Sequence, residues 1–340
     1  MVNMINIEKT SLIPTWQREL QSAFTNINEL LSFLELNVTD LKLYNEAAKN
    51  FPLLVTQSYA ERMAKSDWND PLLRQVLPHP DELEKHPDFL SDPVGDNPAS
   101  VSPGLLHKYH GRILVISTGA CAIHCRYCFR REFPYTDNSA HRSQLDSINQ
   151  YLSNHPDVTE VILSGGDPLT LSDSKLHYLI EELAKQPQVE RIRIHTRLPI
   201  VLPSRITKKL LDTLSSTSKK IIMVIHSNHP NELSDDVSNV LLSLKTIGVT
   251  LLNQTVLLRG VNDNAETLVK LSHRLFNCST IPYYLHLLDK VTGAMHFDST
   301  MSHADDVYHQ IQKKLPGYLV PKLVREEPGK MYKTIIARNS

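Results

Sequence analysis

Short apolar stretches rich in β-branched residues recur along the chain from residue 112 onward. Six of them have the length of a strand: RILVIST, EVILSGG, RIRIHT, KIIMVIH, VTLLNQTVLL and IPYYLHLL. They are largely apolar, which is typical of strands buried on both faces of a parallel sheet. After a longer first unit they recur about every 30 residues, which is the length of one strand and helix repeat. The pattern therefore predicts six parallel strands.

Amphipathic stretches between these runs predict the helices that connect parallel strands. In SDSKLHYLIEELAKQ the apolar residues recur at helical spacing, at Leu176, Leu179, Ile180 and Leu183. A second stretch, PNELSDDVSNVLLSLKTIG, ends at Gly248, and glycine is common just past the end of a helix. The alternation predicts an α/β protein, either a barrel or an open doubly wound sheet, and six units are too few for a closed eight-stranded barrel.

The first hundred residues have a different pattern. Trp16, Leu20, Phe24 and Ile27 share one face of a predicted helix, and irregular sequence follows through DPVGDNPASVSP. We therefore expect three parts along the chain. Residues 1–100 form a helical N-terminal extension and linker, residues 101–300 the strand and helix repeat, and residues 301–340 a C-terminal segment.

Candidate functional residues follow the predicted strands. In either architecture the loops after the carboxyl ends of the strands form the active face. Residues of chemical interest fall at or just past these ends, at Cys121, Gly165, His195, His226, Arg259 and Asp289. We therefore expect them to gather on one face of the protein.

Composition and charge narrow the class of protein. The 340 residues are 41% hydrophobic with only 11 glycines, which excludes a disordered or fibrous chain. Because 36 Lys plus Arg face 37 Asp plus Glu, we expect no nucleic acid and no membrane partner. The first ten residues lack a secretory signal, and no apolar stretch approaches the roughly 20 residues that span a bilayer. A cytoplasmic protein is expected.

Three of the four cysteines, Cys121, Cys125 and Cys128, lie in STGACAIHCRYCFRREF, directly after the first predicted strand. A zinc site usually needs four ligands, and His124 stands between two cysteines, in a poor position to complete one. Three thiolates on a tight loop suit three irons of a four-iron cluster, whose fourth iron can bind a small molecule. Structural zinc, a redox pair or unrelated buried thiols are the alternatives, and Cys278 is expected to be an inert core thiol.

The C-x3-C-x2-C spacing, with Tyr127 before the last cysteine, resembles the signature of the radical S-adenosylmethionine (radical SAM) superfamily. The resemblance implies a partial (βα)6 barrel, with a [4Fe-4S] cluster on the three cysteines and S-adenosyl-L-methionine on the open iron. One-electron reduction would then release a 5′-deoxyadenosyl radical that takes hydrogen from an unactivated carbon. The electron would come from a donor such as flavodoxin or ferredoxin.

The second predicted strand ends in a glycine-rich turn, SGGDP, which contains Gly165, Gly166 and Asp167. Such a turn lets the backbone approach a ligand closely, although Gly-Gly turns are often purely structural. In the superfamily this turn meets the methionine amino group, so the resemblance implies cofactor contacts at these three residues.

Further polar residues at strand ends match positions near S-adenosylmethionine in the lysine 2,3-aminomutase family, to which a closer resemblance is given below. They are His226, Asn228 and Gln254, although a histidine here could merely form a hydrogen bond within a loop. His195 and Arg197 lie in a similar loop, and neither receives a chemical role.

A closer resemblance covers roughly residues 90 to 336 and is to the lysine 2,3-aminomutase family. The matching stretches are DPVGD, KYHGRILV, CRYCFRREF, ILSGGDPL, RIHTRLPIVLPSRIT, HSNHPNE, NQTVLLRGVND, YYLHLLDKVTGAMHF and REEPGK. The resemblance implies an isomerase that converts L-lysine to β-lysine. Within the family the chain looks most like the branch that makes β-lysine for elongation factor P, which implies a link to that factor and its lysyl ligase.

The family also uses pyridoxal 5′-phosphate (PLP), held as a Schiff base by a lysine in a glycine-containing loop. The matching position is Lys330 in EEPGK, which without the resemblance would be a solvated surface lysine. Only an amine can form an imine that the substrate amine displaces. Tyr109 and Arg112, with Lys108 a weaker candidate, match the residues that hold the cofactor ring and phosphate, although Arg112 alone could be a surface charge.

A lysine substrate needs a cation for its carboxylate and an anion for its ε-ammonium. Arg130 matches the family's carboxylate-binding arginine, and Asp289 matches one of two aspartates that recognise the ε-ammonium. Without the family match, either residue could be an ordinary surface charge.

Two departures from the family pattern affect the expected role. The second substrate aspartate is not found before Lys330, where Arg325 stands instead, and the chain stops ten residues after that lysine. Both departures favour the elongation-factor-P branch over the enzymes that act on free lysine and carry a longer tail. The alternatives are an aminomutase for another amino acid such as glutamate, or a non-catalytic iron-sulfur or zinc protein.

Overall fold

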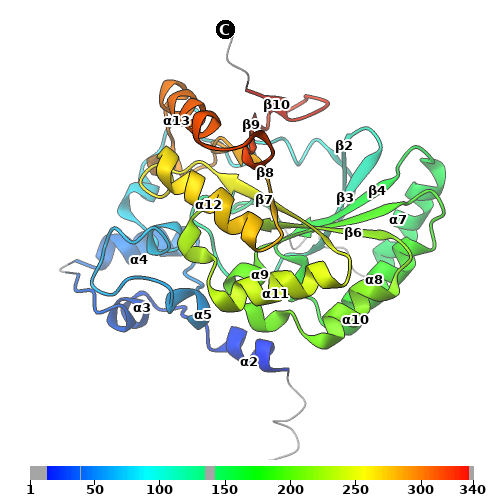
Figure 1. The fold of residues 1–340 in the computed structure, drawn as a ribbon, viewed down its shortest axis with the longest axis horizontal. Helices are drawn as coiled ribbons and strands as arrows, with labels where there is room; N and C mark the ends of the chain where they lie inside the picture. The colour runs from blue at the N-terminus through cyan, green and yellow to red at the C-terminus, as the bar shows by residue number, and fades with distance from the viewer. Residues whose placement is uncertain (1–13, 39, 135–141, 337–340) are drawn as a thin grey trace, which may run out of the picture.

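The computed structural model describes residues 14–38, 40–134 and 142–336, which form one curved sheet flanked by helices (Figure 1). In this part of the chain the sheet has ten strands, which lie in chain order from β1 to β10. Its central strands are parallel and coincide with the six predicted runs: β3 Arg112–Thr118, β4 Glu160–Gly165, β5 Arg191–Thr196, β6 Lys220–His226, β7 Thr250–Val256 and β8 Ile281–His286. The predicted parallel α/β architecture is confirmed.

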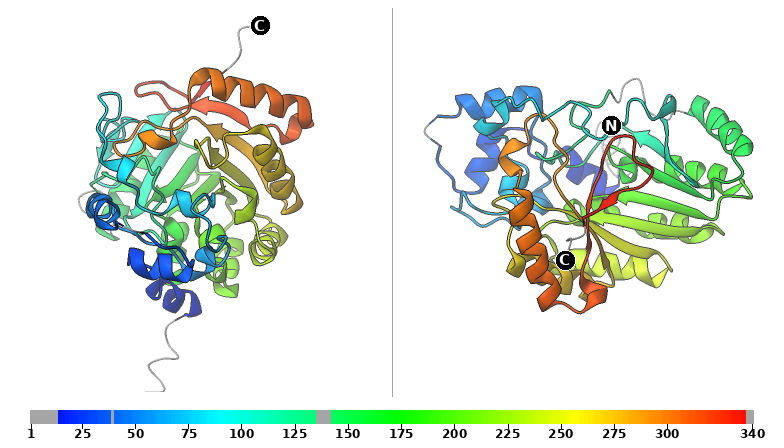
Figure 2. Two further views of the ribbon diagram at one scale, coloured as in Figure 1. Left: turned by 90° about the vertical axis from the view of Figure 1, so that its left-hand side faces the viewer. Right: turned by 90° about the horizontal axis from the view of Figure 1, so that it is seen from above.

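Helices cover the outer side of the sheet, as two further views show (Figure 2). They are α7 Arg142–Asn154, α8 Asp173–Ala184, α10 Lys208–Ser216, α11 Asp235–Thr246, α12 Ala265–Asn277 and α13 Met301–Lys314. Helix α8 buries the four apolar residues that predicted it. Helix α11 ends just before Gly248, whose φ of +88° lies in the left-handed region that favours glycine. Both predicted crossover helices are confirmed, although the PNE that precedes α11 forms a separate 3-10 turn, η5 Pro230–Glu232.

Four short strands extend the sheet beyond the six predicted ones. They are β1 Ser100–Ser102, β2 Leu105–Tyr109, β9 Lys322–Arg325 and β10 Thr334–Ile335. Strand β9 pairs parallel to β8, whereas β1, β2 and β10 pair antiparallel with their neighbours. The sheet therefore draws its strands from the second and third predicted parts of the chain, with β1 beginning at the boundary residue Ser100, and the proposed boundaries stay a prediction.

The prediction of one N-terminal helix through Trp16 and Ile27 is wrong. Helix α2 Thr15–Gln21 ends early, and Phe24 instead forms a β-bridge with Val55. Helix α3 Ile27–Phe33 then starts afresh, because the Asn26 side chain accepts hydrogen bonds from the first backbone N–H groups of that helix. Later segments of the extension are α4 Lys42–Asn50, α5 Gln57–Ala60, η1 Leu73–Gln75 and η2 Pro80–Leu83.

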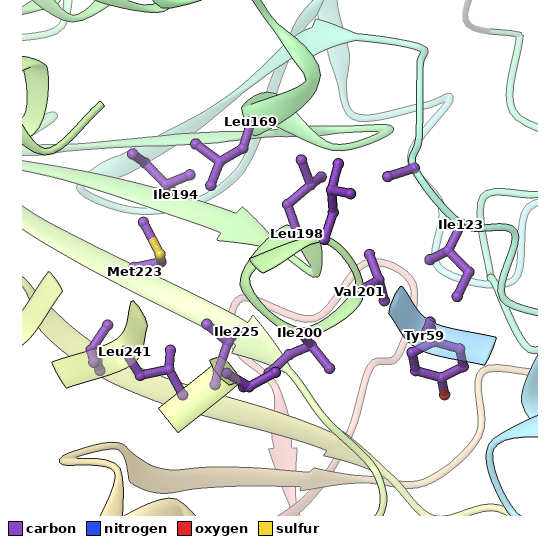
Figure 3. Packing of buried hydrophobic residues seen from close by; sticks show 14 of the residues in the cluster. Tyr59, Ile123, Leu169, Ile194, Leu198, Ile200, Val201, Met223, Ile225 and Leu241 are labelled. Atoms are coloured by element: carbon purple, nitrogen blue, oxygen red, sulfur yellow. The ribbon is translucent and has the colours of Figure 1, made fainter. Parts of the chain in front are cut away.

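The N-terminal extension packs against the end of the sheet where the cysteines lie. Tyr59 of α5, Ile123 of the cysteine loop and Val201 of the short helix α9 Leu198–Val201 belong to one buried apolar cluster (Figure 3). Burial of apolar side chains is the main source of stability in a domain, so the extension is part of the folded core. No helix within the described residues is both long and apolar enough to cross a membrane.

Candidate active site

A cavity of about 850 Å³ runs along the parallel strands to their carboxyl ends, and this volume is typical of small-molecule sites. Its lining brings together almost every site residue predicted from the sequence: Cys121, Cys125, Cys128, Tyr109, Arg112, Tyr127, Arg130, Gly165, Gly166, Asp167, His226, Asn228, Gln254 and Asp289. Lys330 is the exception, because it is exposed and is not among the lining residues. Of the six strand-end residues predicted to share one face, Cys121, Gly165, His195, His226 and Asp289 line this cavity, whereas Arg259 does not.

The three clustered cysteines are free thiols on the loop after β3 and face this cavity. Burial raises the pKa of Cys121 and raises that of Cys128 to about 11, so both thiols keep their protons until a metal displaces them. Among the described residues, no three His, Cys, Asp or Glu side chains converge to hold a single metal ion. Cys278 lies apart from the loop, where it is buried and contacts Ser238 Oγ at 3.1 Å. The donor set fits an iron-sulfur cluster better than one zinc ion.

The glycine-rich turn is shaped first by the cysteine loop beside it. A Cβ at Gly165 would lie 2.5 Å from the Thr118 carbonyl oxygen, and one at Gly166 would lie 2.3 Å from the Ala120 carbonyl oxygen. Gly165 also has a φ of +119°. No other residue type fits this close approach of two backbones, so the purely structural reason for Gly-Gly is sufficient, and a cofactor contact here stays a prediction.

The side chains of Asp167 and Asn228 form hydrogen bonds with other groups of the protein. The Asp167 carboxylate accepts hydrogen bonds from Thr196 Oγ1 at 2.7 Å and from the Arg197 backbone N–H at 2.7 Å. Burial raises its pKa to about 6, against the opposing effect of these hydrogen bonds. Asn228 bonds to Gln75 at 3.0 Å and to the Val256 backbone at 2.8 Å. Both residues hold neighbouring loops in place around the cavity.

Arg130 is buried and held by a carboxylate from before β1. Its Nε donates to Asp96 Oδ2 at 2.6 Å, and one of its terminal nitrogens donates to Ser164 Oγ at 3.0 Å. Lys108 lies on the other side of Asp96, with its Nζ 2.6 Å from Oδ1. Asp96 therefore pairs with two cations, and Lys108 Nζ also lies 3.9 Å from Glu326 Oε1.

A second group of charges lies where β8 and the C-terminal hairpin meet. Glu326 forms an ion pair with Lys333 and accepts a hydrogen bond from the Tyr109 hydroxyl. Burial alone would raise the pKa of Glu326, but Lys333 and these hydrogen bonds lower it. Asp289 lines the same space, and burial raises its pKa to about 7 although the charge of Lys333 opposes the shift. Lys333 and Glu326 both line the cavity, and neither was predicted from the sequence as a site residue.

Three histidines line the cavity at or next to the last residues of β5, β6 and β8: His195, His226 and His286. The Nε2 atom of each is buried and has no hydrogen-bond partner among the described residues. Burial lowers the pKa of all three, to about 4 for His226, and the charge of Lys333 lowers it further. Neutral imidazoles with unpaired nitrogens are suited to hydrogen bonding with a polar ligand.

The N-terminal extension contributes polar residues to the site that were not predicted from the sequence. Glu82 pairs with two arginines of the cysteine loop, Arg126 and Arg131, and the distance to Arg131 is 2.8 Å. Gln75 bonds to Arg197 at 2.8 Å and to Glu232 at 3.0 Å. No periodicity or spacing marks these residues, because only tertiary packing places them at the cysteine loop.

Comparison with known proteins is consistent with this geometry. Residues 115–271 match the family described as the radical SAM superfamily. The L-lysine 2,3-aminomutase of Escherichia coli (strain K12) is 45% identical over 320 residues, which cover 94% of this chain and 93% of the relative. That of Buchnera aphidicola subsp. Baizongia pistaciae (strain Bp) is 44% identical over 325 residues, with 95% and 96% covered.

A solved radical SAM methyltransferase from Sphaerobacter thermophilus aligns with a TM-score of 0.45 at 14% identity, over 65% of this chain and 68% of that one. A structural similarity this low does not contribute to the assignment of the family. The two aminomutases, in contrast, match over nearly their full length. The chain therefore belongs to the L-lysine 2,3-aminomutase family, a family of isomerases within the radical SAM superfamily.

Proposed function

We propose that this protein is an L-lysine 2,3-aminomutase, an isomerase that moves the amino group of L-lysine from the α- to the β-carbon. The observation that carries the proposal is one cavity lined by the cysteine loop, by Arg130, and by Lys333 with two carboxylates, Asp289 and Glu326. A lysine substrate needs a cation at one end and anions at the other, and this cavity offers both. The names of the similar proteins support the same reaction.

Three groups are proposed to bind in this cavity: a [4Fe-4S] cluster, S-adenosyl-L-methionine and PLP. Superfamily membership supports the first two, and the three cysteine thiols are suitable donors for the cluster. When bound, these groups supply hydrogen-atom abstraction from carbon and an imine across which an amino group can migrate. On the S-adenosylmethionine side we propose Tyr127, Gly165, Gly166, His226 and Gln254 as contacts, with Asp167 and Asn228 as supports.

For the PLP amine we propose Lys333, and Lys330 becomes the alternative. Lys333 lines the cavity, is only 24% exposed and is close enough to the three histidines to lower their pKa values. Lys330 is exposed, and its backbone N–H donates to the Glu327 carbonyl oxygen in a turn. A group that must react inside the cavity has to lie in it, which supports Lys333.

The phosphate of PLP is proposed to bind near Arg112, with Tyr109 beside the ring. The Arg112 guanidinium lies 4.5 Å from the centre of the Tyr109 ring, and both line the cavity. Lys108 is a weaker candidate, because Asp96 and the Val94 carbonyl already hold its ammonium group. Arg112 therefore offers the fixed cation that a phosphate requires.

The two ends of the substrate are proposed to bind Arg130 and the carboxylate pair. Arg130 is oriented by Asp96 and suits the substrate carboxylate. Glu326 and Asp289 line the same cavity, so two carboxylates would face the ε-ammonium of a lysine substrate, with Glu326 in the role of the second aspartate that the sequence lacks.

These charges oppose the alternative substrates and classes. Two carboxylates beside the substrate side chain would repel a glutamate side chain, which argues against a glutamate aminomutase. A purely structural iron-sulfur or zinc protein has no need of an 850 Å³ cavity with charged groups around it. No observation favours either alternative.

The cellular role is proposed as the supply of β-lysine for elongation factor P through its lysyl ligase. The electron is proposed to come from a flavodoxin or ferredoxin. Free thiols and a cluster that must be reduced suit a reducing compartment, in line with the expected cytoplasmic location. Incubation of the enzyme, L-lysine, the ligase and elongation factor P should add β-lysine to the factor, as intact-protein mass spectrometry would detect.

The reaction itself can be tested after anaerobic reconstitution with iron, sulfide and PLP. The reduced enzyme, S-adenosyl-L-methionine and a panel of amino acids are incubated, and the products are analysed by mass spectrometry against authentic β-amino acids. We expect β-lysine from L-lysine and little product from glutamate. Equal turnover of glutamate, or no turnover of any amino acid by a fully loaded enzyme, would contradict the proposal.

A further inference from the structure

We propose that Arg197 raises the reduction potential of the iron-sulfur cluster by donating a charged hydrogen bond to Cys125. Glu232, which pairs with the other terminal nitrogen of Arg197, partly opposes this increase. The inference rests on the proposed cluster at the three cysteines. It assigns a tuning role to a cavity-lining arginine for which the proposed function names none.

The guanidinium of Arg197 is fixed against the sulfur. One terminal nitrogen lies 2.7 Å from Cys125 Sγ, and the other donates to Gln75 Oε1 at 2.8 Å and to the Tyr59 hydroxyl at 3.1 Å. The residue is only 5% exposed, so water does not screen the contact strongly. Because its nitrogens are bonded to three different segments, the group has no free rotation away from the cysteine.

The counter-charge lies on the far side of the arginine. Glu232 Oε2 is 3.2 Å from the second terminal nitrogen of Arg197, and this carboxylate is completely buried. Its other oxygen accepts hydrogen bonds from Gln75 Nε2 at 3.0 Å and from the Asn228 backbone N–H at 3.1 Å. The pair is neutral overall, but its positive end touches the sulfur and its negative end does not.

This arrangement favours the reduced form of the cluster. One electron from an external donor converts the oxidised cluster to a reduced cluster with one additional negative charge, shared by its sulfurs. A cation in contact with a ligand sulfur stabilises that extra charge, and hydrogen bonds to ligand sulfurs are known to tune cluster potentials. The carboxylate opposes the effect, but weakly, since it is farther from the sulfur.

The test is a redox titration of the reconstituted cluster with dithionite, followed by electron paramagnetic resonance. For Arg197→Gln we expect the ratio of reduced to oxidised cluster to fall about tenfold at the midpoint potential of the unmodified protein. Such a change is a shift of 59 mV for a one-electron couple. Glu232→Gln should shift the midpoint in the opposite direction, and Arg197→Lys, which keeps the charge, should shift it less than Arg197→Gln.

Two further variants separate tuning from folding. Arg197→Gln alone leaves Glu232 buried without its cation, so the double variant Arg197→Gln/Glu232→Gln removes both charges together. Its midpoint should still fall, by less than in the single variant. Arg205→Gln is the matched control, because Arg205 is also fully buried and paired, with Asp173 at 2.8 Å, but does not touch the cysteine loop. Its midpoint should stay unchanged.

The proposal is overturned if Glu232→Gln and the double variant bind iron normally and keep the midpoint of the unmodified protein. It is also overturned if Arg205→Gln shifts the midpoint as much as Arg197→Gln does. The titration needs only the cluster, so it is independent of lysine turnover. Normal shifts in a loaded protein that converts no amino acid would refute the proposed reaction alone, and turnover without any shift would refute only this inference.

Discussion

Replacement of Asp289 by asparagine tests how the site recognises the substrate side chain. The variant keeps the size of the side chain and removes its charge, so the ε-ammonium of lysine loses one charged hydrogen bond. Such a bond in a partly desolvated site contributes about 1.5 to 3 kcal/mol. The value of kcat/KM for lysine should therefore fall roughly tenfold to a hundredfold in Asp289→Asn, with iron and PLP content unchanged.

The pH dependence gives a second and sharper measure of the same group. Burial raises the pKa of Asp289 to about 7 beside the charge of Lys333, and loss of that charge to PLP would raise it further, so this group gains its negative charge as the pH rises from 6 to 8. Only the ionised form pairs with an ammonium, so the contribution of Asp289 to kcat/KM should rise about tenfold from pH 6 to pH 8. The ratio of the unmodified to the variant kcat/KM, measured at each pH, isolates this group from others that titrate.

The control is Asp298→Asn, which removes an equal charge from the same stretch of chain. Asp298 is not among the cavity-lining residues, and its nearest ion-pair partner is Lys290 at 3.9 Å. Its substitution should leave lysine kinetics unchanged. The reasoning would be refuted by a flat ratio close to one across this pH range, or by an equal effect of the control.

Three other outcomes follow from the structure. Borohydride reduction of the PLP-loaded protein and peptide mapping should place the label on Lys333, and a label on Lys330 would contradict that assignment. Glu82→Gln leaves two buried arginines without their carboxylate and should lower the free energy of unfolding by about 3 to 5 kcal/mol in a denaturant titration, whereas a loss under 1 kcal/mol would show that the pairs matter little. Gly166→Ala forces a Cβ into the Ala120 carbonyl and should reduce iron bound after reconstitution, while Gly317→Ala, with open space around it, should not.

The strand ends of the site were predictable from the sequence, and the C-terminal hairpin was not. Runs of apolar residues define the parallel strands, and the topology then places Cys121, His226 and Asp289 on one face whatever their side chains do. Lys330 and Lys333 are only three residues apart, and which one faces the cavity depends on the pairing of β10 with β9. A two-residue strand carries no periodic signal, so the prediction of Lys330 rested on the family resemblance alone.

The stretch of chain shared with the superfamily is shorter than the stretch that packs around the cysteine loop. The stretch shared with the radical SAM superfamily is residues 115–271, and this is the unit that evolution has reused. Tyr59, Gln75 and Glu82 lie before it, yet they hold the buried guanidiniums of Arg126 and Arg197. A fragment cut at the superfamily boundaries would expose apolar surface and leave these cations without partners. A unit that keeps all of these partners must therefore include α5 Gln57–Ala60, well before the stretch shared with the superfamily.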